Sequence, residues 1–309
     1  MIQSALCAAA FTLTACLPLA AHAAETLTGA YGLPDGRPKV GATLAATPGR
    51  GGVETLDIAM TELGKQRPVA RYETELSKQL HVIAISSDFR TFVHEHADRP
   101  AANGHFRVAV PLPRPGLYHV YADAAPSGIG QQVMRFELNV GGRPAQAPPA
   151  APTPSPLQAA DGRYAARFDP FELRAGQESQ IGLHLSHDGK PAGDVTPFLG
   201  VAAHAVFINA ADLTYVHVHA TLDAAPNTGA PMQRNLAGTT ATTPAAQRGM
   251  AGMEMPDGDA MPPSLRAGAR VPPDLTLHVL APKAGTYLLW IQFTAGGKVR
   301  TVPFVVAVS

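Results

Sequence analysis

Two stretches of the sequence carry three histidines at the same spacing. Residues 80–97 read LHVIAISSDFRTFVHEHA, and residues 203–220 read AHAVFINAADLTYVHVHA. In each, a second histidine follows the first by thirteen positions, and a third comes two positions later. Neutral imidazole is a common ligand of transition metals. The candidate metal ligands are therefore His81, His94 and His96 in the first stretch and His204, His217 and His219 in the second.

The first stretch consists of two apolar runs around a polar break, which predicts a β-hairpin. The hairpin forms when Ser86 pairs with Thr91 across a four-residue loop. His81 then lies opposite His96, and Cβ atoms of opposed residues are only about 5 Å apart. Because strand side chains alternate, His94 lies on the same face as these two.

The second stretch predicts the same hairpin, with His204 opposite His219 and Val206 opposite His217. The histidine faces also carry apolar side chains, namely Ile83, Ile85, Phe92, Val206, Ile208 and Tyr215. Three imidazoles among apolar groups cannot all be charged cheaply, whereas a metal ion binds the neutral rings. We expect one metal patch in each copy, independent of the other. The alternative is that the duplication repeated structural histidines.

A second group of candidate ligands lies in residues 223–268, an insertion present only in the second copy. It is rich in Ala, Thr, Gly and Pro, which predicts a loop. Its candidate ligands are Met250, Met253, Met255 and Met261. Thioethers are soft, neutral ligands that favour Cu(I). The alternative is chance clustering in a low-complexity loop.

Composition excludes several classes of function. Lys and Arg together number 24 and so do Asp and Glu, so no overall charge attracts nucleic acid. The two cysteines, Cys7 and Cys16, both lie near the start, which excludes thiolate metal sites from the folded part. The sequence has no nucleophile elbow and no phosphate-binding glycine loop, so we expect a protein that is not an enzyme.

The first 23 residues are expected to be a signal peptide. An apolar run from Ala5 to Ala20 is too short to span a bilayer, and Ala21-His22-Ala23 resembles a cleavage site. The alternative is a lipoprotein anchored through Cys16, because Leu13-Thr14-Ala15-Cys16 resembles a lipobox. Either route exports the chain, so we expect a periplasmic or secreted protein with no transmembrane segment in its mature form.

The rest of the chain predicts an all-β protein of two similar parts. Many short alternating segments separated by Gly/Pro turns favour two tandem antiparallel immunoglobulin-like β-sandwiches. We expect the first at residues 24–141 and the second at residues 161–309. Residues 142–160 contain six prolines among alanines, which predicts an extended linker.

The repeated order resembles a repeat found in exported bacterial proteins of immunoglobulin-like fold. The similar features are the hairpin motif F/Y-V-H-x-H and a following P-x-x-G-x-Y, which contains Gly116 and Tyr118 in the first copy and Gly285 and Tyr287 in the second. That repeat is often associated with copper or heavy-metal handling, so the resemblance implies fold and compartment and is compatible with metal binding. The proline that commonly follows H-x-H is replaced here by Ala97 and Ala220.

These features together favour a periplasmic metal-binding protein, with copper first, that serves as a buffer or carrier. The methionines would hold Cu(I), and the histidine patches Cu(II) or zinc. One alternative is an interaction module that binds another envelope protein, and another is an accessory subunit of an oxidoreductase. The remaining histidines are expected to be ordinary surface or strand residues, namely His105, His119, His184, His187 and His278.

Overall fold

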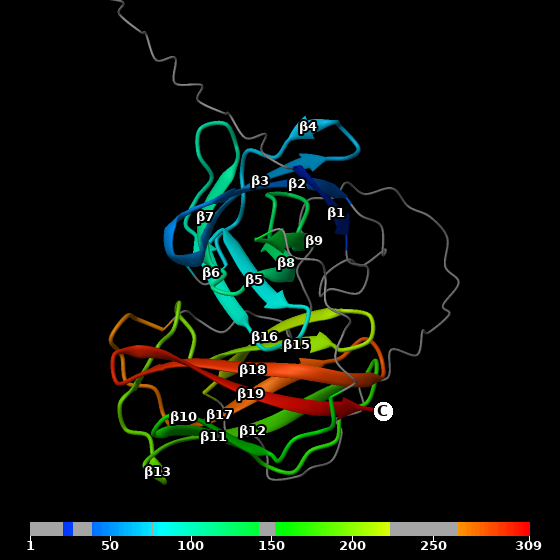
Figure 1. The fold of residues 1–309 in the computed structure, drawn as a ribbon. Helices are drawn as coiled ribbons and strands as arrows, with labels where there is room; N and C mark the ends of the chain where they lie inside the picture. The colour runs from blue at the N-terminus through cyan, green and yellow to red at the C-terminus, as the bar shows by residue number, and fades with distance from the viewer. Residues whose placement is uncertain (1–20, 27–38, 76, 142–151, 223–264) are drawn as a thin grey trace, which may run out of the picture.

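The computed structural model describes residues 21–26, 39–75, 77–141, 152–222 and 265–309. This part of the chain is all-β, with antiparallel strand pairing and no α-helix. The strands fall into two units, which Figure 1 shows one above the other. None of the described elements is a helix of the length and apolarity that crossing a membrane requires.

The first unit contains nine strands in two layers. In one layer, β3 pairs with β2 along one edge and with both β4 and β7 along the opposite edge. The other layer has the order β9-β8-β5-β6. Strand β1 joins them, because residues 21–23 pair with β2 and residues 24–26 pair with β9. The bounds are β1 Ala21–Thr26, β2 Val40–Pro48, β3 Val53–Glu62, β4 Arg67–Pro68, β5 Leu80–Ser86, β6 Phe92–Ala97, β7 Phe106–Pro111, β8 Gly116–Ala124 and β9 Gln132–Val140, with a short 3-10 turn η1 at Arg50–Gly52.

The second unit repeats this arrangement with ten strands. One layer has the order β10-β11-β12-β17, with β13 beside β12, and the other consists of β16, β15, β18, β14 and β19. Strand β16 joins the layers, since Ala220 and Thr221 pair with β17. The bounds are β10 Gln158–Asp161, β11 Tyr164–Phe168, β12 Glu178–His187, β13 Lys190–Pro191, β14 Val195–Thr196, β15 His204–Asn209, β16 Tyr215–Thr221, β17 Asp274–Leu280, β18 Gly285–Ala295 and β19 Lys298–Val308.

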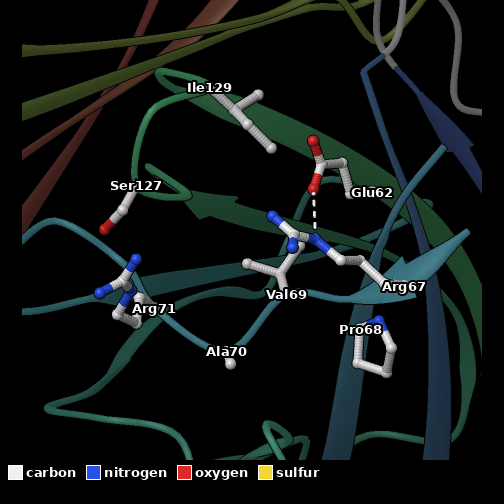
Figure 2. Close-up of a pocket in the computed structure, with 8 residues that line it drawn as sticks. All are labelled: Glu62, Arg67, Pro68, Val69, Ala70, Arg71, Ser127 and Ile129. Atoms are coloured by element: carbon white, nitrogen blue, oxygen red, sulfur yellow. Dashed lines mark hydrogen bonds and ion pairs between the residues drawn. The ribbon is translucent and has the colours of Figure 1, made fainter. Parts of the chain in front are cut away.

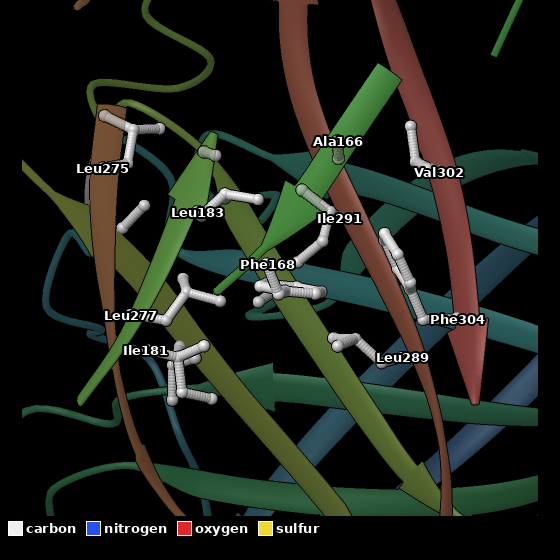
Figure 3. Packing of buried hydrophobic residues seen from close by; sticks show 14 of the residues in the cluster. Ala166, Phe168, Ile181, Leu183, Leu275, Leu277, Leu289, Ile291, Val302 and Phe304 are labelled. Carbon is white, nitrogen blue, oxygen red and sulfur yellow. The ribbon is translucent and has the colours of Figure 1, made fainter. Parts of the chain in front are cut away.

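Each unit encloses its own apolar core between its layers. In the first unit, Leu56 and Ile58 of β3 pack in one buried cluster with Val120 of β8. In the second, Figure 3 shows Leu183 of β12, Phe168 of β11 and Leu289 of β18 in one cluster. Alternate residues of these strands point inward, which is the arrangement that a two-residue apolar period indicates.

The last residues of the predicted linker at 142–160 belong to the second unit. Residues 142–151 lie outside the described part, but β10 already begins at Gln158. Ser155 donates its backbone N–H to the carbonyl of Val305 at 2.9 Å, and its hydroxyl accepts from the Val305 N–H at 3.0 Å. Proline has no N–H, but Ser155 stands between two prolines and keeps its own, so it can pair with β19.

Two other predicted boundaries meet the described structure. The expected signal-peptide cleavage after Ala23 falls inside β1, and that cleavage stays a prediction. Of the predicted insertion at residues 223–268, residues 223–264 lie outside the described part, and residues 265–268 lie within it. Leu265 packs against the second core and donates its N–H to the Gly200 carbonyl at 2.6 Å, so the insertion ends before it.

Candidate metal centre

Both histidine hairpins have the predicted register. In the first, β5 and β6 place His81 opposite His96 and Ile83 opposite His94. The Ser86 N–H donates to the Thr91 carbonyl at 3.0 Å and closes the loop. In the second, β15 and β16 pair in the same way, with His204 opposite His219 and Val206 opposite His217. The histidines of each hairpin therefore share one face.

These two faces cover each other. The apolar residues of both faces form a third buried cluster, which contains Ile83, Ile85, Tyr121, Val133, Val206, Ile208, Tyr215, Leu288 and Trp290. Figure 1 shows β5 and β6 next to β15 and β16, where the two units meet. The histidine face of one unit is thus buried by the histidine face of the other.

Two aromatic stacks hold this contact, and they are reciprocal. Phe92 of the first hairpin stacks on Trp290 of β18, with ring centroids 4.6 Å apart and planes 16° from parallel. Tyr215 of the second hairpin stacks on Tyr121 of β8, at 5.1 Å and 20°. Each hairpin therefore packs one aromatic ring on a strand of the other unit, β18 in one case and β8 in the other. Such pairs add about 0.5–1.5 kcal/mol beyond the area they bury.

The six histidines form a single cluster, which corrects the prediction of two independent patches. The ring centroids of His94 and His217, one from each unit, are 5.3 Å apart. Those of His94 and His204 are 5.4 Å apart, and those of His81 and His217 are 5.3 Å apart. The physical reason is the apolar lining of each face, which is covered by the opposite unit instead of by water.

Two sets of three histidines have geometry suited to a metal ion. The outer triad contains His81, His94 and His96, all from the first hairpin, and the inner triad contains His94, His204 and His217, from both units. Within each triad the candidate nitrogens lie within 4.8 Å of one another. A zinc–nitrogen bond is about 2.0–2.1 Å long, so small ring rotations bring three such nitrogens to one ion.

Hydrogen bonds outside the cluster set which nitrogen of two inner rings carries a proton. Nδ1 of His94 lies 2.8 Å from Oε1 of Gln292, and Nε2 of His204 lies 3.0 Å from the carbonyl oxygen of Phe198. Both oxygens accept, so both nitrogens donate. Nδ1 of His217 faces Oδ2 of Asp123 at 3.6 Å. The lone pairs of the first two rings are then on Nε2 of His94 and Nδ1 of His204, and a proton on Nδ1 of His217, toward Asp123, would leave the third on Nε2.

Ring nitrogens of the cluster lie close to one another. Nδ1 of His204 and Nε2 of His217 are 3.1 Å apart, Nε2 of His94 is 3.0 Å from Nε2 of His96, and Nδ1 of His81 is 3.4 Å from Nε2 of His94. A proton on one ring of each pair makes a hydrogen bond between two nitrogens, and a metal ion could take the place of such protons. Nε2 of His219 is buried and has no hydrogen-bond partner among the described residues. The arrangement gathers nitrogen atoms that could hold a cation.

Burial keeps the rings neutral. It lowers the pKa of His81 to about 4 and the pKa of His94 to about 3, with further lowering by neighbouring rings. Burial and the adjacent histidines also lower the pKa of His96, His204, His217 and His219. Protons therefore compete with a metal ion only well below pH 6.5, the ordinary pKa of histidine.

One buried carboxylate lies beside the cluster. Asp123 is fully buried, and its oxygens accept hydrogen bonds from Nε2 of Gln131 at 2.9 Å and from the Tyr215 hydroxyl at 3.0 Å. Burial raises the pKa of Asp123, while His81 and these hydrogen bonds act against that rise. Burial and this carboxylate raise the pKa of Tyr215, so its hydroxyl stays protonated and donates.

The sequence interpretation missed Asp123, Gln292 and Phe198. Asp123 pairs with His81 across β5 and β8, and Gln292 pairs with His204 across β15 and β18. Each therefore occupies the same position in its unit, two residues after the stacked Tyr121 or Trp290. An alignment of the two copies would have matched these two polar residues. No signal in the sequence indicates the role of the Phe198 carbonyl.

The other predicted residues lie elsewhere. Met250, Met253, Met255 and Met261 are outside the described residues. The remaining histidines contact carboxylates away from the cluster: His105 contacts Asp57, His119 Glu137, His184 Asp169 and Asp274, His187 Asp188 and Asp194, and His278 Glu178. These contacts agree with the expectation that they are ordinary surface or strand residues.

A pocket of about 210 Å³ in the first unit is separate from the histidines. It lies beside β4, and Figure 2 shows Glu62 bound to Arg67, with Val69 and Ile129 in its wall. None of its lining residues is a predicted site residue. We assign it no role.

The sequence matches one protein family over both units. The family, described as "Domain of unknown function (DUF8832)", matches residues 37–142 and 158–309. The chain belongs to this family. The matched residues contain all six histidines as well as Asp123 and Gln292, so the whole cluster lies within them. A search of curated proteins finds no significant match.

Proposed function

We propose that this protein binds a transition-metal ion, copper first, and acts as a periplasmic buffer or carrier without enzymatic activity. One observation carries the proposal: six histidines from two units are gathered as neutral rings, four of them buried, and two overlapping sets of three could hold a metal. Unpaired polar groups are costly to bury, typically about 1–3 kcal/mol each. Within the cluster, Nε2 of His81 and Nε2 of His219 have no hydrogen-bond partner in the described structure, and a bound cation would offset part of that cost.

The donor set supports copper or zinc. Neutral imidazole suits Cu, Zn, Fe and Ni, whereas Mg²⁺ and Ca²⁺ prefer oxygen ligands. Met250, Met253, Met255 and Met261 supply thioethers suited to Cu(I) in the same chain. We therefore propose Cu(II) or zinc at the histidines and Cu(I) at the methionines.

The proposal includes the finer description of the fold and of the compartment. We propose that the two units are tandem immunoglobulin-like β-sandwiches joined by a proline-rich linker, and that the first 23 residues direct export. The repeated strand order and the two layers of each unit support this fold assignment. Another envelope protein would be the natural recipient of the ion.

A structural role for the histidines is the competing hypothesis. It is favoured by the aromatic stacks and the apolar cluster, which bury the histidine faces without any metal. In that case the cluster only joins the two units. The two hypotheses differ in whether the chain retains metal through its histidines.

Metal analysis of the purified chain tests the proposal. The full chain would be isolated from copper-fed cells, alongside a His94→Gln/His217→Gln variant and a His278→Gln control. Copper and zinc per chain would be measured in each, before and after zinc addition. We expect the double variant to lose histidine-bound metal and the control to keep it. Equal metal content in all three proteins would contradict the proposal and favour the structural role.

A further inference from the structure

The outer and inner triads share His94, and His94 has only one nitrogen to offer. Its Nδ1 is 2.8 Å from Oε1 of Gln292, and the amide nitrogen of Gln292 is in turn held by Oγ1 of Thr301 at 3.0 Å. The Gln292 oxygen is thus oriented to accept, and Nδ1 of His94 donates to it. The neutral ring keeps one lone pair, at Nε2, and one lone pair ligates one ion.

We propose that the cluster holds one transition-metal ion at a time, in two overlapping positions that share His94. The outer position adds His81 and His96, and the inner position adds His204 and His217. The ion is of the class that accepts three neutral imidazoles, such as copper, zinc or cobalt. This inference rests on the proposed function and specifies how the ion enters and where it stays.

Exposure makes the outer position the entry. His96 is half-buried, whereas His204 has no exposed surface and His217 only 9%. The outer triad belongs wholly to the β5–β6 hairpin, and the inner triad needs both units. An ion would therefore meet the outer triad first and reach the inner triad by exchanging two ligands while His94 stays bound.

Orientation of the rings makes the inner position the resting one. Two inner rings have hydrogen-bond partners outside the cluster, because Gln292 faces His94 and the Phe198 carbonyl faces His204. The third, His217, lies 3.6 Å from Asp123. In the outer triad, Nε2 of His81 has no hydrogen-bond partner in the described structure. Rings that are already oriented lose less freedom on binding, so the inner triad binds more tightly.

Charge supports a bound cation at either position. The buried carboxylate of Asp123 lies 3.6 Å from Nδ1 of His217, an inner ligand, and it is also the cross-strand neighbour of His81, an outer ligand. A buried cation is costly without a counter-charge, and this carboxylate supplies one beside both triads. The preference for the inner position therefore rests on ring orientation.

Titration of the full chain with Co(II) tests this proposal, because Co(II) bound to imidazoles gives visible absorption and thioethers bind it weakly. We expect one tightly bound Co(II) per chain. His94→Gln removes a ligand from both positions, so its affinity should fall by more than the roughly 10–100-fold that loss of an outer-shell partner costs. His278→Gln is the matched control and should behave as the unmodified chain.

The spectra of two variants separate the positions. His96→Gln leaves the inner triad intact, so it should keep the wild-type spectrum and affinity but load more slowly. His217→Gln leaves only the outer triad, so it should bind one Co(II) more weakly and with a different spectrum. Circular dichroism would verify that each variant is folded. The predicted stoichiometry of one Co(II) per chain is measured on the unmodified protein, so it does not depend on the folding of any variant.

Three outcomes would overturn the shared-ligand proposal. They are two tightly bound Co(II) ions per unmodified chain, wild-type affinity in the folded His94→Gln variant, and identical spectra in the His96→Gln and His217→Gln variants. With two Co(II) bound, metal binding itself would stand, and His94 would bridge them through both nitrogens. Absence of any tight Co(II), zinc or copper binding would instead reject the proposed function.

Discussion

Asp123 and Gln292 occupy the same position in the two units but differ in charge. Each lies on a central strand opposite the first histidine of its own hairpin, and each faces the middle histidine of the other hairpin. The first unit thus gives a carboxylate to His217, and the second gives an amide to His94. The two units therefore have the same backbone arrangement at this position. Because the first unit has Asp123 where the second has Gln292, only the first unit supplies a negative charge.

The largest expected effect comes from breaking the two aromatic stacks. Trp290→Ala removes the partner of Phe92, and Tyr121→Ala removes the partner of Tyr215. Since both rings are buried, each change should lower the free energy of unfolding by about 3–5 kcal/mol. Chemical denaturation would measure this, with Val299→Ala, which is 45% exposed, as a control. If only one stack matters, the two sides of the contact are not equivalent.

An intermediate effect is expected from removing the charge difference between the units. Asp123→Asn gives both sides an amide, and metal affinity should fall by about 10–100-fold because His217 loses its anionic partner. Competitive zinc titration would measure it. Asp98→Asn is a suitable control, since Asp98 is exposed and pairs with Lys78. Unchanged affinity in Asp123→Asn would mean that the carboxylate does not act on the ion.

A further effect, which accumulates with each pH unit, should appear in the pH dependence of metal-free stability. The folded pKa of His81 is about 4 and that of His94 about 3, both below the ordinary 6.5, so the unfolded chain binds protons first. Stability is then fully present above pH 6.5 and falls as the pH drops toward those values. Each buried histidine contributes about 1.4 kcal/mol per pH unit in this window.

Single replacements would compare the two hairpins in this respect. His94→Gln and His217→Gln should each reduce the slope of unfolding free energy against pH by about 1.4 kcal/mol per pH unit, the contribution of one buried histidine. Asp123 still faces the cluster in both variants. Thermal unfolding between pH 7 and pH 4 would show it. His278→Gln, which removes a half-exposed histidine away from the cluster, is the matched control. A slope that survives both cluster replacements would mean that other groups cause it.

Much of the site follows from local rules applied to the sequence. The thirteen-residue spacing and the alternation of strands fix which histidines are opposed, and the structure has that register. The two-residue apolar period also predicts an all-β protein with antiparallel sheets, which the structure confirms. Local pattern can therefore place His81, His94 and His96 on one face, and the same holds for the second hairpin.

The contact between the units could not be read in the same way. A strand pattern shows which face is apolar but does not identify what covers it. Ile83, Phe92 and Tyr215 on the histidine faces indicated burial, yet the covering surface comes from residues more than 100 positions away in the sequence. The roles of Gln292 and Asp123 depend on that contact, so they become visible only when both units are in place.

The reciprocal stacks have the form of an isologous interface, in which the same patch appears on both partners. A surface that gives one ring and accepts one ring is complementary to a copy of itself. Two separate copies of a single such unit could therefore pair as a symmetric homodimer, with a histidine cluster on the twofold axis. Joining both copies in one polypeptide removes the symmetry constraint, so that a substitution on one side need not be repeated on the other.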